Sequence, residues 1–223
     1  MLKITVSDEL AVKVPKLQLA FIECDVDMQL FNEELWNEIQ QKIVEIYSKM
    51  QIEDIKDIPA VSASRKAYKA CGKDPARYRL SAEALLRRVV NRNELYQINN
   101  VVDALNLVSI STGFSIGGYD AEKIEGDIIY AIGEENEPYQ GIGRGELNIE
   151  GMPVFRDAKG AFGTPTSDSE RTSVSMETKR FLMIIINYDS SPQLAEATEM
   201  AKGLLEKYAH AKNLEIKNIA NYP

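Results

Sequence analysis

Apolar residues in the first 60 positions follow two different periods. Three short runs rich in β-branched residues predict strands over residues 3–6, 11–14 and 17–24. From residue 28 to residue 50, apolar residues recur at steps of three and four, which predicts a long amphipathic helix. Its expected buried positions are Phe31, Leu35, Ile39, Ile43 and Ile46, with Trp36 beside them as core filler. Its expected solvent-facing positions are Glu33, Glu34, Glu38, Lys42 and Lys49.

Helical spacing and capping residues recur further along the chain. Helices are expected over residues 62–71, from an N-cap at Ser81 to about residue 92, from a cap at Asn100, and over residues 193–209. A segment of different character follows residue 113, where glycines separate short apolar pieces. These pieces are typical of strands joined by tight turns, and they lie at residues 127–132, 145–149 and 152–156.

A continuous apolar run at residues 181–188 completes the pattern and predicts a buried central strand. Strands and helices intermixed in this way favour an α/β fold of the α+β type, with mixed sheets and covering helices. The chain has no internal repeat and no low-complexity linker. Residues 1–223 are therefore expected to form a single compact domain, or two intimately packed subdomains.

The composition excludes several kinds of site. The single His210 argues against a catalytic triad built on an imidazole base. Cys24 and Cys71 stand far apart and, with that one histidine, provide no Cys/His zinc site and no disulfide framework. We therefore expect no metal and no cofactor. The first ten residues do not resemble a signal peptide and the longest strongly apolar run is short, so the expected location is cytoplasmic, without a membrane partner.

The basic residues are concentrated in one segment. The chain carries 26 basic and 34 acidic residues, a net charge of −8, yet nine basic residues and only Asp74 and Glu83 lie between residues 64 and 92. Tyr68 and Tyr78 are interleaved with these cations, as in surfaces on which unpaired bases stack. The candidate RNA-binding residues are Arg77, Arg79, Arg87, Arg88 and Arg92. The alternative is that these arginines form the solvated face of an amphipathic helix.

Residues 81–120 contain an ordered set of motifs. A helix ending in basic residues is followed by Ile-Asn-Asn-Val-Val-Asp at residues 98–103, by Asn106, by Gly113 and by Tyr119-Asp120. This order resembles the editing domain, the B3/B4 module, of the phenylalanyl-tRNA synthetase β subunit. Shorter matches at residues 145–151, 155–157 and 167–179 extend the resemblance over residues 79–188. The chain has no room for a synthetase's catalytic core, so it resembles a free-standing member of the family.

The resemblance implies a function and a site. In the family this module hydrolyses the ester of tRNA mischarged with tyrosine, and its pocket lies between two subdomains. Asn106 and Glu170 fall on two of the family's pocket residues and are the catalytic candidates. The expected substrate-binding residues are Gly117, Gly118, Thr164, Thr166, Ser167, Asp168, Ser169 and Arg171.

Two departures from the family pattern bear on the chemistry. Gly117 stands where the family has a histidine, and Asp168-Ser169 stand where it has two glycines. Other roles for these residues are a solvated turn at residues 164–173, a structural hydrogen bond at Asn106, and a surface ion pair between Glu170 and Arg171. Family resemblance nevertheless predicts that Asn106, residues 113–120 and residues 164–171 converge on one cleft, with residues 77–92 along its mouth.

Three functions remain open from the sequence. The first is a trans-acting deacylase that removes an incorrect amino acid from a tRNA. The second is a module that binds tRNA or another structured RNA without chemistry, and the third is an amino-acid-binding protein that has reused the pocket. The expected partner is the aminoacylated end of a tRNA rather than DNA. The sequence leaves open whether the protein is an enzyme, and it does not determine the oligomeric state.

Overall fold

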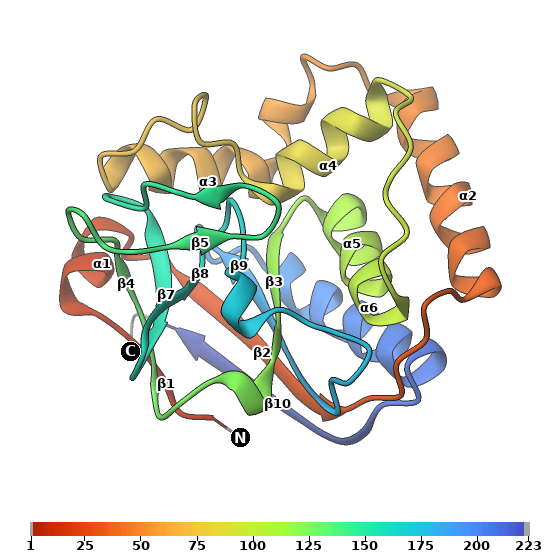
Figure 1. The fold of residues 1–223 in the computed structure, drawn as a ribbon. Helices are drawn as coiled ribbons and strands as arrows, with labels where there is room; N and C mark the ends of the chain where they lie inside the picture. Colours follow the sequence, from red (N-terminus) through yellow and green to blue (C-terminus); the bar gives the residue numbers. More distant parts are fainter. Residues whose placement is uncertain (1, 221–223) are drawn as a thin grey trace.

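A computed structural model describes residues 2–220, which form two four-stranded sheets, a two-stranded sheet of β5 and β6, and helices beside one of the larger sheets (Figure 1). The sheets have the strand orders β10-β2-β9-β3 and β1-β4-β7-β8. The strands are β1 (Ile4–Val6), β2 (Gln18–Asp25), β3 (Ser115–Asp120), β4 (Ile128–Ile132), β5 (Gln140–Gly141), β6 (Gly145–Glu146), β7 (Pro153–Asp157), β8 (Gly160–Gly163), β9 (Arg180–Asn187) and β10 (Lys212–Ala220). The α-helices are α1 (Asp8–Lys13), α2 (Glu33–Lys49), α3 (Pro59–Ala70), α4 (Ser81–Val90), α5 (Asn100–Thr112) and α6 (Gln193–Tyr208).

The sheet containing β9 separates two hydrophobic cores. Along β9, Phe181, Met183 and Ile185 belong to the core under the helices, whereas the alternate residues Leu182 and Ile184 belong to the core shared with the other sheet. Successive side chains of a strand point to opposite faces, so a strand buried on both faces has a continuous apolar sequence. The central strand expected at residues 181–188 is thereby confirmed.

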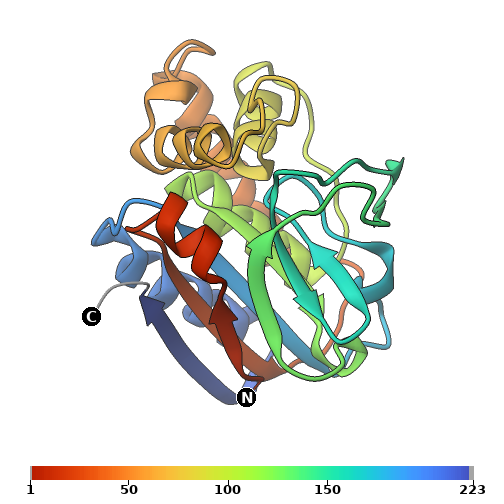
Figure 2. The same ribbon diagram turned by 90° about the vertical axis from the view of Figure 1, so that its left-hand side faces the viewer.

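Helices cover one face of this sheet and the second sheet covers the other (Figure 2). Buried residues of α2, α4, α5 and α6 share a core with one face of β2, β3 and β9. The second core holds residues of β1, β4, β7 and β8 against the opposite face of β2 and β9. Helix α3 contributes to both, through Ala60 and Val61 on the helical side and Ala63 and Ala67 on the other. The expected α/β fold with mixed sheets and covering helices is confirmed.

The segment at residues 11–14, expected to be a strand, is helical. Residues 11–13 form the second half of α1, and Val14 is its C-cap. The N-cap Ser7 accepts a hydrogen bond from the Leu10 backbone at 3.3 Å. Leu10 is the buried residue of this helix, while Val12 is exposed. Three consecutive apolar residues, Leu10, Ala11 and Val12, define no period, and the cap at Ser7 favours the helix.

The long helix, α2, begins later in the sequence than expected. It begins at Glu33, where the Asn32 side chain accepts from the Leu35 backbone, so Phe31 precedes the helix and is 51% exposed. Leu35, Ile39 and Ile46 are buried as expected. Ile43 is only partly buried.

Helix caps and four strands also differ from expectation. Asn99, not Asn100, caps α5, and Leu80 precedes the first residue of α4 without a side-chain cap. The sequence did not predict β3, β8 and β10, nor the two-residue strand β5. Glycines interrupt β3 and β8, and β10 is an almost entirely exposed edge strand, so neither carries the apolar run that predicts a strand.

Candidate functional site

The polar turn at residues 164–169 is held by hydrogen bonds within the protein. Thr164 Oγ1 donates to the Ser167 carbonyl at 2.9 Å and accepts from the Ser167 backbone N–H at 3.0 Å. Thr166 Oγ1 lies 2.8 Å from the hydroxyl of Tyr68 on α3, which is fully buried. These polar side chains, which the sequence suggested for substrate binding, therefore have structural partners. Their role in binding a substrate stays a prediction.

The phenol ring of Tyr119 fills the space between β3 and β8. A Cβ atom at Gly117 or at Gly163 would lie 2.1 Å from the Tyr119 hydroxyl oxygen, so a larger residue at either position would displace the ring. A Cβ at Gly118 would instead meet a side chain of α5 at 2.7 Å. The Tyr119 hydroxyl donates to Asp168 Oδ1 at 2.8 Å. The glycines of this region thus make room for the protein's own tyrosine.

Asp168 is a carboxyl group whose ionisation the fold perturbs. Burial raises its pKa to about 7, although hydrogen bonds from Tyr119 and from the backbone of Gly118 favour its charged form. Burial, together with the neighbouring Asp168, raises the pKa of Tyr119 well above its ordinary value. Asp168 therefore changes charge near neutral pH while Tyr119 stays neutral.

Glu170 and Arg171 have separate surroundings. Arg171 forms a bidentate ion pair with Asp157, with nitrogen–oxygen distances of 2.8 and 2.9 Å. This pair stands in place of the surface ion pair between Glu170 and Arg171 that was one alternative. Glu170 is exposed beside Ser169, which caps the short helix at Glu170–Thr172, and it lines a cavity of about 460 Å³.

Asn106 and Glu170 lie in different surroundings. Asn106 is half-buried on α5. Glu170 lines one of the five main cavities of the described residues, and Asn106 lines none of these five. The start of α4 does reach the polar turn, because Ser81 N donates to the Pro165 carbonyl at 2.7 Å. The cleft expected between Asn106 and Glu170 stays a prediction without a cavity to support it.

The basic segment at residues 64–92 divides into paired and unpaired cations. Glu83 is 1% exposed and accepts from Arg65 at 2.8 Å and from Arg87 at 3.1 Å, with Arg79 at 3.9 Å. Lys73 is buried and donates to backbone carbonyls of the loop after β6. These side chains hold α3, α4 and a loop together.

The two tyrosines interleaved with the cations differ in their exposure. Tyr68 is 0% exposed, so a ligand has no access to its ring and the expectation that bases stack on it is wrong. Tyr78 is half-buried beneath the Lys73 ammonium group, 4.1 Å from the ring centroid, and the Arg77 guanidinium, 5.4 Å from it.

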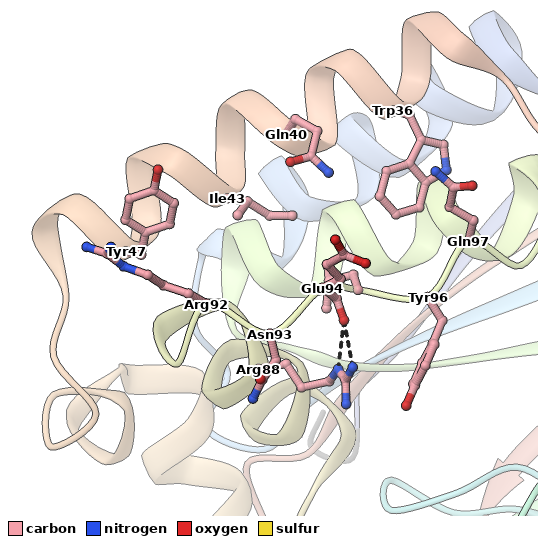
Figure 3. Close-up of a pocket in the computed structure, with 11 residues that line it drawn as sticks. Trp36, Gln40, Ile43, Tyr47, Arg88, Arg92, Asn93, Glu94, Tyr96 and Gln97 are labelled. Carbon is pink, nitrogen blue, oxygen red and sulfur yellow. Dashed lines mark hydrogen bonds between the residues drawn. The ribbon is translucent and has the colours of Figure 1, made fainter.

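A cavity of about 700 Å³ lies between α2 and the segment that follows α4 (Figure 3). One wall is a single stripe of α2, because residues three and four apart share a helix face. The stripe consists of Trp36, Gln40, Ile43 and Tyr47. The other wall is formed by Arg88, Arg92, Asn93, Glu94, Leu95, Tyr96 and Gln97. Ile43 packs against the helical core and is only partly buried because it also lines this cavity.

Arg88 and Arg92 are placed by the end of α4. Arg92 adopts φ 57°, the left-handed conformation that favours glycine, at the position just after the C-cap Asn91. The backbone bonds from Asn93 N to the Arg88 carbonyl and from Arg92 N to the Val89 carbonyl form a Schellman motif.

Both guanidinium groups rest on tyrosine rings. Arg92 lies 5.1 Å from the Tyr47 ring centroid on α2, and Arg88 lies 4.3 Å from that of Tyr96. Arg88 also donates to the Glu94 carbonyl from Nε and Nη2. Among the described residues, neither arginine has a carboxylate partner within ion-pair distance. Two positive charges without ion-pair partners therefore stand at a cavity whose lining includes one acid, Glu94.

Buried hydrogen bonds fix the base of the cavity. Asp103 accepts from Trp36 Nε1 at 2.8 Å and from the Ile98 backbone at 3.0 Å, which ties α2 and the 91–98 segment to α5. Asn100 accepts from the Gln29 backbone and donates to two carbonyls, one of them at the end of α6. The rings and arginines above are thus carried by a rigid support.

This arrangement suits binding an anionic aromatic ligand. Tyrosine and tryptophan rings stack on planar groups, arginine binds phosphate, and the amides of Gln40, Asn93 and Gln97 both donate and accept hydrogen bonds. Among the described residues, no cluster of histidine, cysteine or carboxylate side chains is placed to hold a metal ion. No helix of the same residues has the length and apolar character needed to cross a membrane.

Sequence reasoning found two residues of this cavity and missed most of the rest. Arg88 and Arg92 were among the RNA-binding candidates, and Trp36 and Ile43 were assigned to the core. Tyr47 and Gln40 share the helical stripe with Trp36, and that stripe was a usable signal. Tyr96 and Gln97 lie in an irregular segment, so no periodicity indicated which way they face.

Comparison with known proteins identifies the relatives of this chain. The family model of the B3/4 domain matches residues 63–210. No curated protein matches the chain. Among solved structures, it is similar to an N-terminal fragment of the phenylalanyl-tRNA synthetase beta subunit from Pyrococcus horikoshii, with 16% identity and a TM-score of 0.48. That alignment covers 98% of this chain and 53% of the fragment, so the chain spans about half of the fragment's length.

Proposed function

Because the chain belongs to the B3/4 domain family, we propose that it is an RNA-binding protein that binds tRNA at the cavity between α2 and residues 88–97. The motifs at residues 79–188 resemble those of a tRNA synthetase's editing module, which makes tRNA the RNA that the family relation favours. Membership of this family supports tRNA as the partner, and the cavity provides the cationic and aromatic groups that would bind it.

The observation that carries the proposal is a pair of arginines without ion-pair partners beside exposed aromatic surface. Arg88 and Arg92 lie over tyrosine rings, while Arg87, the other arginine of α4, pairs with buried Glu83. An arginine that the fold does not need for an ion pair is free to bind a phosphate. Tyr96, 67% exposed, adds a ring on which a base can stack.

The acidic net charge limits where RNA can bind. A surface that carries −8 overall repels a polyanion unless cations are segregated from acids. The cavity wall contributed by α2 carries no charge at Trp36, Gln40, Ile43 and Tyr47, and Glu94 is the single acid in the lining. We therefore expect RNA to bind at this face, and we expect its affinity to depend strongly on salt concentration.

The test is binding of unmodified tRNA, followed by fluorescence anisotropy at several salt concentrations. The variant Arg88→Glu/Arg92→Glu should bind tRNA at least about tenfold more weakly, because two phosphate contacts become repulsive. The slope of log K against log salt should fall in magnitude by about 1.5, as two counterion-release contacts are lost. Undiminished binding would contradict the proposal for this surface.

A matched control is available on β10. The variant Lys212→Glu/Lys217→Glu changes the charge equally, on an edge strand that contributes no residue to the cavity. It should retain wild-type affinity within about twofold. An equal loss in both variants would show that only net charge matters.

A second candidate function, deacylation of mischarged tRNA, is favoured by Asp168. A carboxyl group with a pKa of about 7 is poised to take a proton from a water that attacks an ester carbonyl, while the tRNA 3′ hydroxyl leaves. Thr164, Thr166 and Ser167 lie in the same turn, and hydrogen bonds within the protein hold their polar groups in place. Asp168, rather than Glu170, is then the general base.

Release of amino acid from a panel of mischarged tRNAs tests the second candidate. The rate should rise with pH through about 7, because the base acts in its deprotonated form, and Asp168→Asn should abolish this rise. Glu170→Gln should leave it unchanged. Absence of release by folded protein from every tRNA would exclude deacylation and leave the binding proposal standing.

A further inference from the structure

We infer that the cavity between α2 and residues 88–97 takes one unpaired base of an RNA single strand, with the phosphates on either side of that base at Arg88 and Arg92. This inference rests on the proposed RNA-binding function and deepens it. It states which part of an RNA enters the site, and it excludes a duplex as the ligand.

The two arginines lie on different parts of the cavity wall. Figure 3 shows Arg92 reaching toward Tyr47 at one end of the α2 wall, while Arg88 lies across from that wall and points toward Glu94 and Tyr96. A free mononucleotide presents its phosphate at one end only. A nucleotide inside a strand has a phosphate on each side, which matches two separated cations.

Between the arginines the lining is uncharged at most positions and suits a base. Figure 3 places the Gln40 amide and the Ile43 side chain between Tyr47 and Trp36 along α2. Asn93 and Gln97 add amide groups from the opposite wall. Amides pair with the polar edges of a base, and those edges are accessible only when the base is unpaired. The volume of about 700 Å³ lies within the range of small-ligand sites.

The conformation of Arg92 indicates that its side chain has a role beyond the fold. Glycine is the residue that best fits φ 57° at this position after a helix C-cap, and any side chain there costs stability. Arg92 makes no carboxylate contact that offsets this cost within the described residues. Its contact is the ring of Tyr47, which lines the cavity.

The test uses three labelled RNA probes with the full protein: a seven-nucleotide single strand of mixed sequence, the same strand with abasic sites at every position, and the strand paired to its complement. We expect the single strand to bind most tightly. The abasic strand should bind at least about fivefold more weakly, since base stacking contributes that much per base. The duplex should also bind more weakly.

Two variants and two matched controls assign the effect to the cavity. Tyr96→Ala should weaken single-strand binding at least about fivefold, while Phe31→Ala, at another exposed aromatic outside the cavity, should not. Arg92→Gly should weaken binding and lower the salt slope by about 0.7 without lowering the thermal midpoint. Asn136→Gly relieves a second φ of 57° away from the cavity and should leave binding unchanged.

The outcomes separate this inference from the proposed function. If the abasic strand or the duplex binds as tightly as the intact strand, the base does not enter the cavity and the inference is overturned. Loss of tRNA binding in the arginine double variant would still support the proposed function in that case. If neither tRNA nor any oligonucleotide binds, both fail.

Discussion

Asn99, Asn100 and Asp103 show how a motif that suggests a family also builds the structure around the site. Asn99 caps α5 by accepting from the Val102 backbone. Asn100 is fully buried and joins the segment before α2 to the end of α6. Asp103 holds Trp36 and the 91–98 segment. These residues position the cavity walls and do not line the cavity themselves.

Replacing Asp103 should therefore destabilise the protein. Asp103→Ala leaves the Trp36 indole N–H and the Ile98 backbone N–H without their acceptor, at a cost of roughly 2–4 kcal/mol. Asp103→Asn, which keeps one acceptor oxygen, should cost less. Urea unfolding measures both. A loss below about 0.5 kcal/mol for the alanine variant would show that water replaces these bonds freely.

Asp168 gives the protein a pH dependence of stability with a defined sign. Its pKa is about 7 in the folded protein and about 3.9 in an unfolded chain, so the folded state retains a proton between these values. The free energy that the protonated Asp168 contributes to folding is fully present below about pH 4 and is lost as the pH rises through 7. Tyr119 and Tyr139, whose pKa values are raised by burial, stay neutral across this range.

The variant Asp168→Asn removes this dependence. Its thermal midpoint, minus that of the wild type, should increase between pH 4 and pH 7.5, because only the wild type must ionise a buried carboxyl. Glu170→Gln, at an exposed position, provides the control and should show a constant difference. A midpoint difference for Asp168→Asn that does not change with pH would contradict the assigned pKa shift.

At the scale of elements, α2 carries two apolar stripes with different tasks. Leu35, Ile39 and Ile46 pack into the helical core. Ile43 belongs to the neighbouring stripe that lines the cavity. The steps of three and four along the sequence are the same for both stripes, so periodicity alone assigns all of them to the core.

Alanine substitutions distinguish the two stripes. Ile39→Ala should cost about 2–5 kcal/mol, as expected for a side chain that is 1% exposed. Ile43→Ala should cost only about 1 kcal/mol, because part of this side chain already meets solvent. The free energy of unfolding from urea titration gives both values. Equal losses would show that the cavity is closed in solution.

At the scale of the whole molecule, the sheet β10-β2-β9-β3 couples the two cores. Its central strands bury alternate residues in the helical core and in the core shared with the second sheet. Loss of either core exposes one face of the same strands. We therefore propose that residues 1–223 fold as a single domain.

Cooperative unfolding checks this proposal. Trp36, the single tryptophan, reports on the helical side, while Tyr119 and Tyr130 report on the other core. Tryptophan fluorescence and near-ultraviolet circular dichroism should give coincident denaturation curves. Separate midpoints would instead support two subdomains that unfold independently.

The sequence by itself determined the elements whose burial is continuous or strictly periodic. The run at residues 181–188 and the stripes of α2, α5 and α6 predicted strand or helix because each hides an apolar face. Short or polar elements such as α1 and β10 were not predicted from the sequence, because their conformation depends on a cap or on a neighbouring strand.

Only the tertiary structure decided which side chains line the candidate binding cavity and which are used within the fold. Arg87 and Arg88 are adjacent in sequence, yet one pairs with buried Glu83 and the other faces the cavity, because their directions differ around α4. The polar turn at residues 164–169 and the glycines of β3 suggested an open pocket, but Tyr119 occupies the space between them. Which side chain fills which space depends on contacts between distant segments, and no local pattern records those contacts.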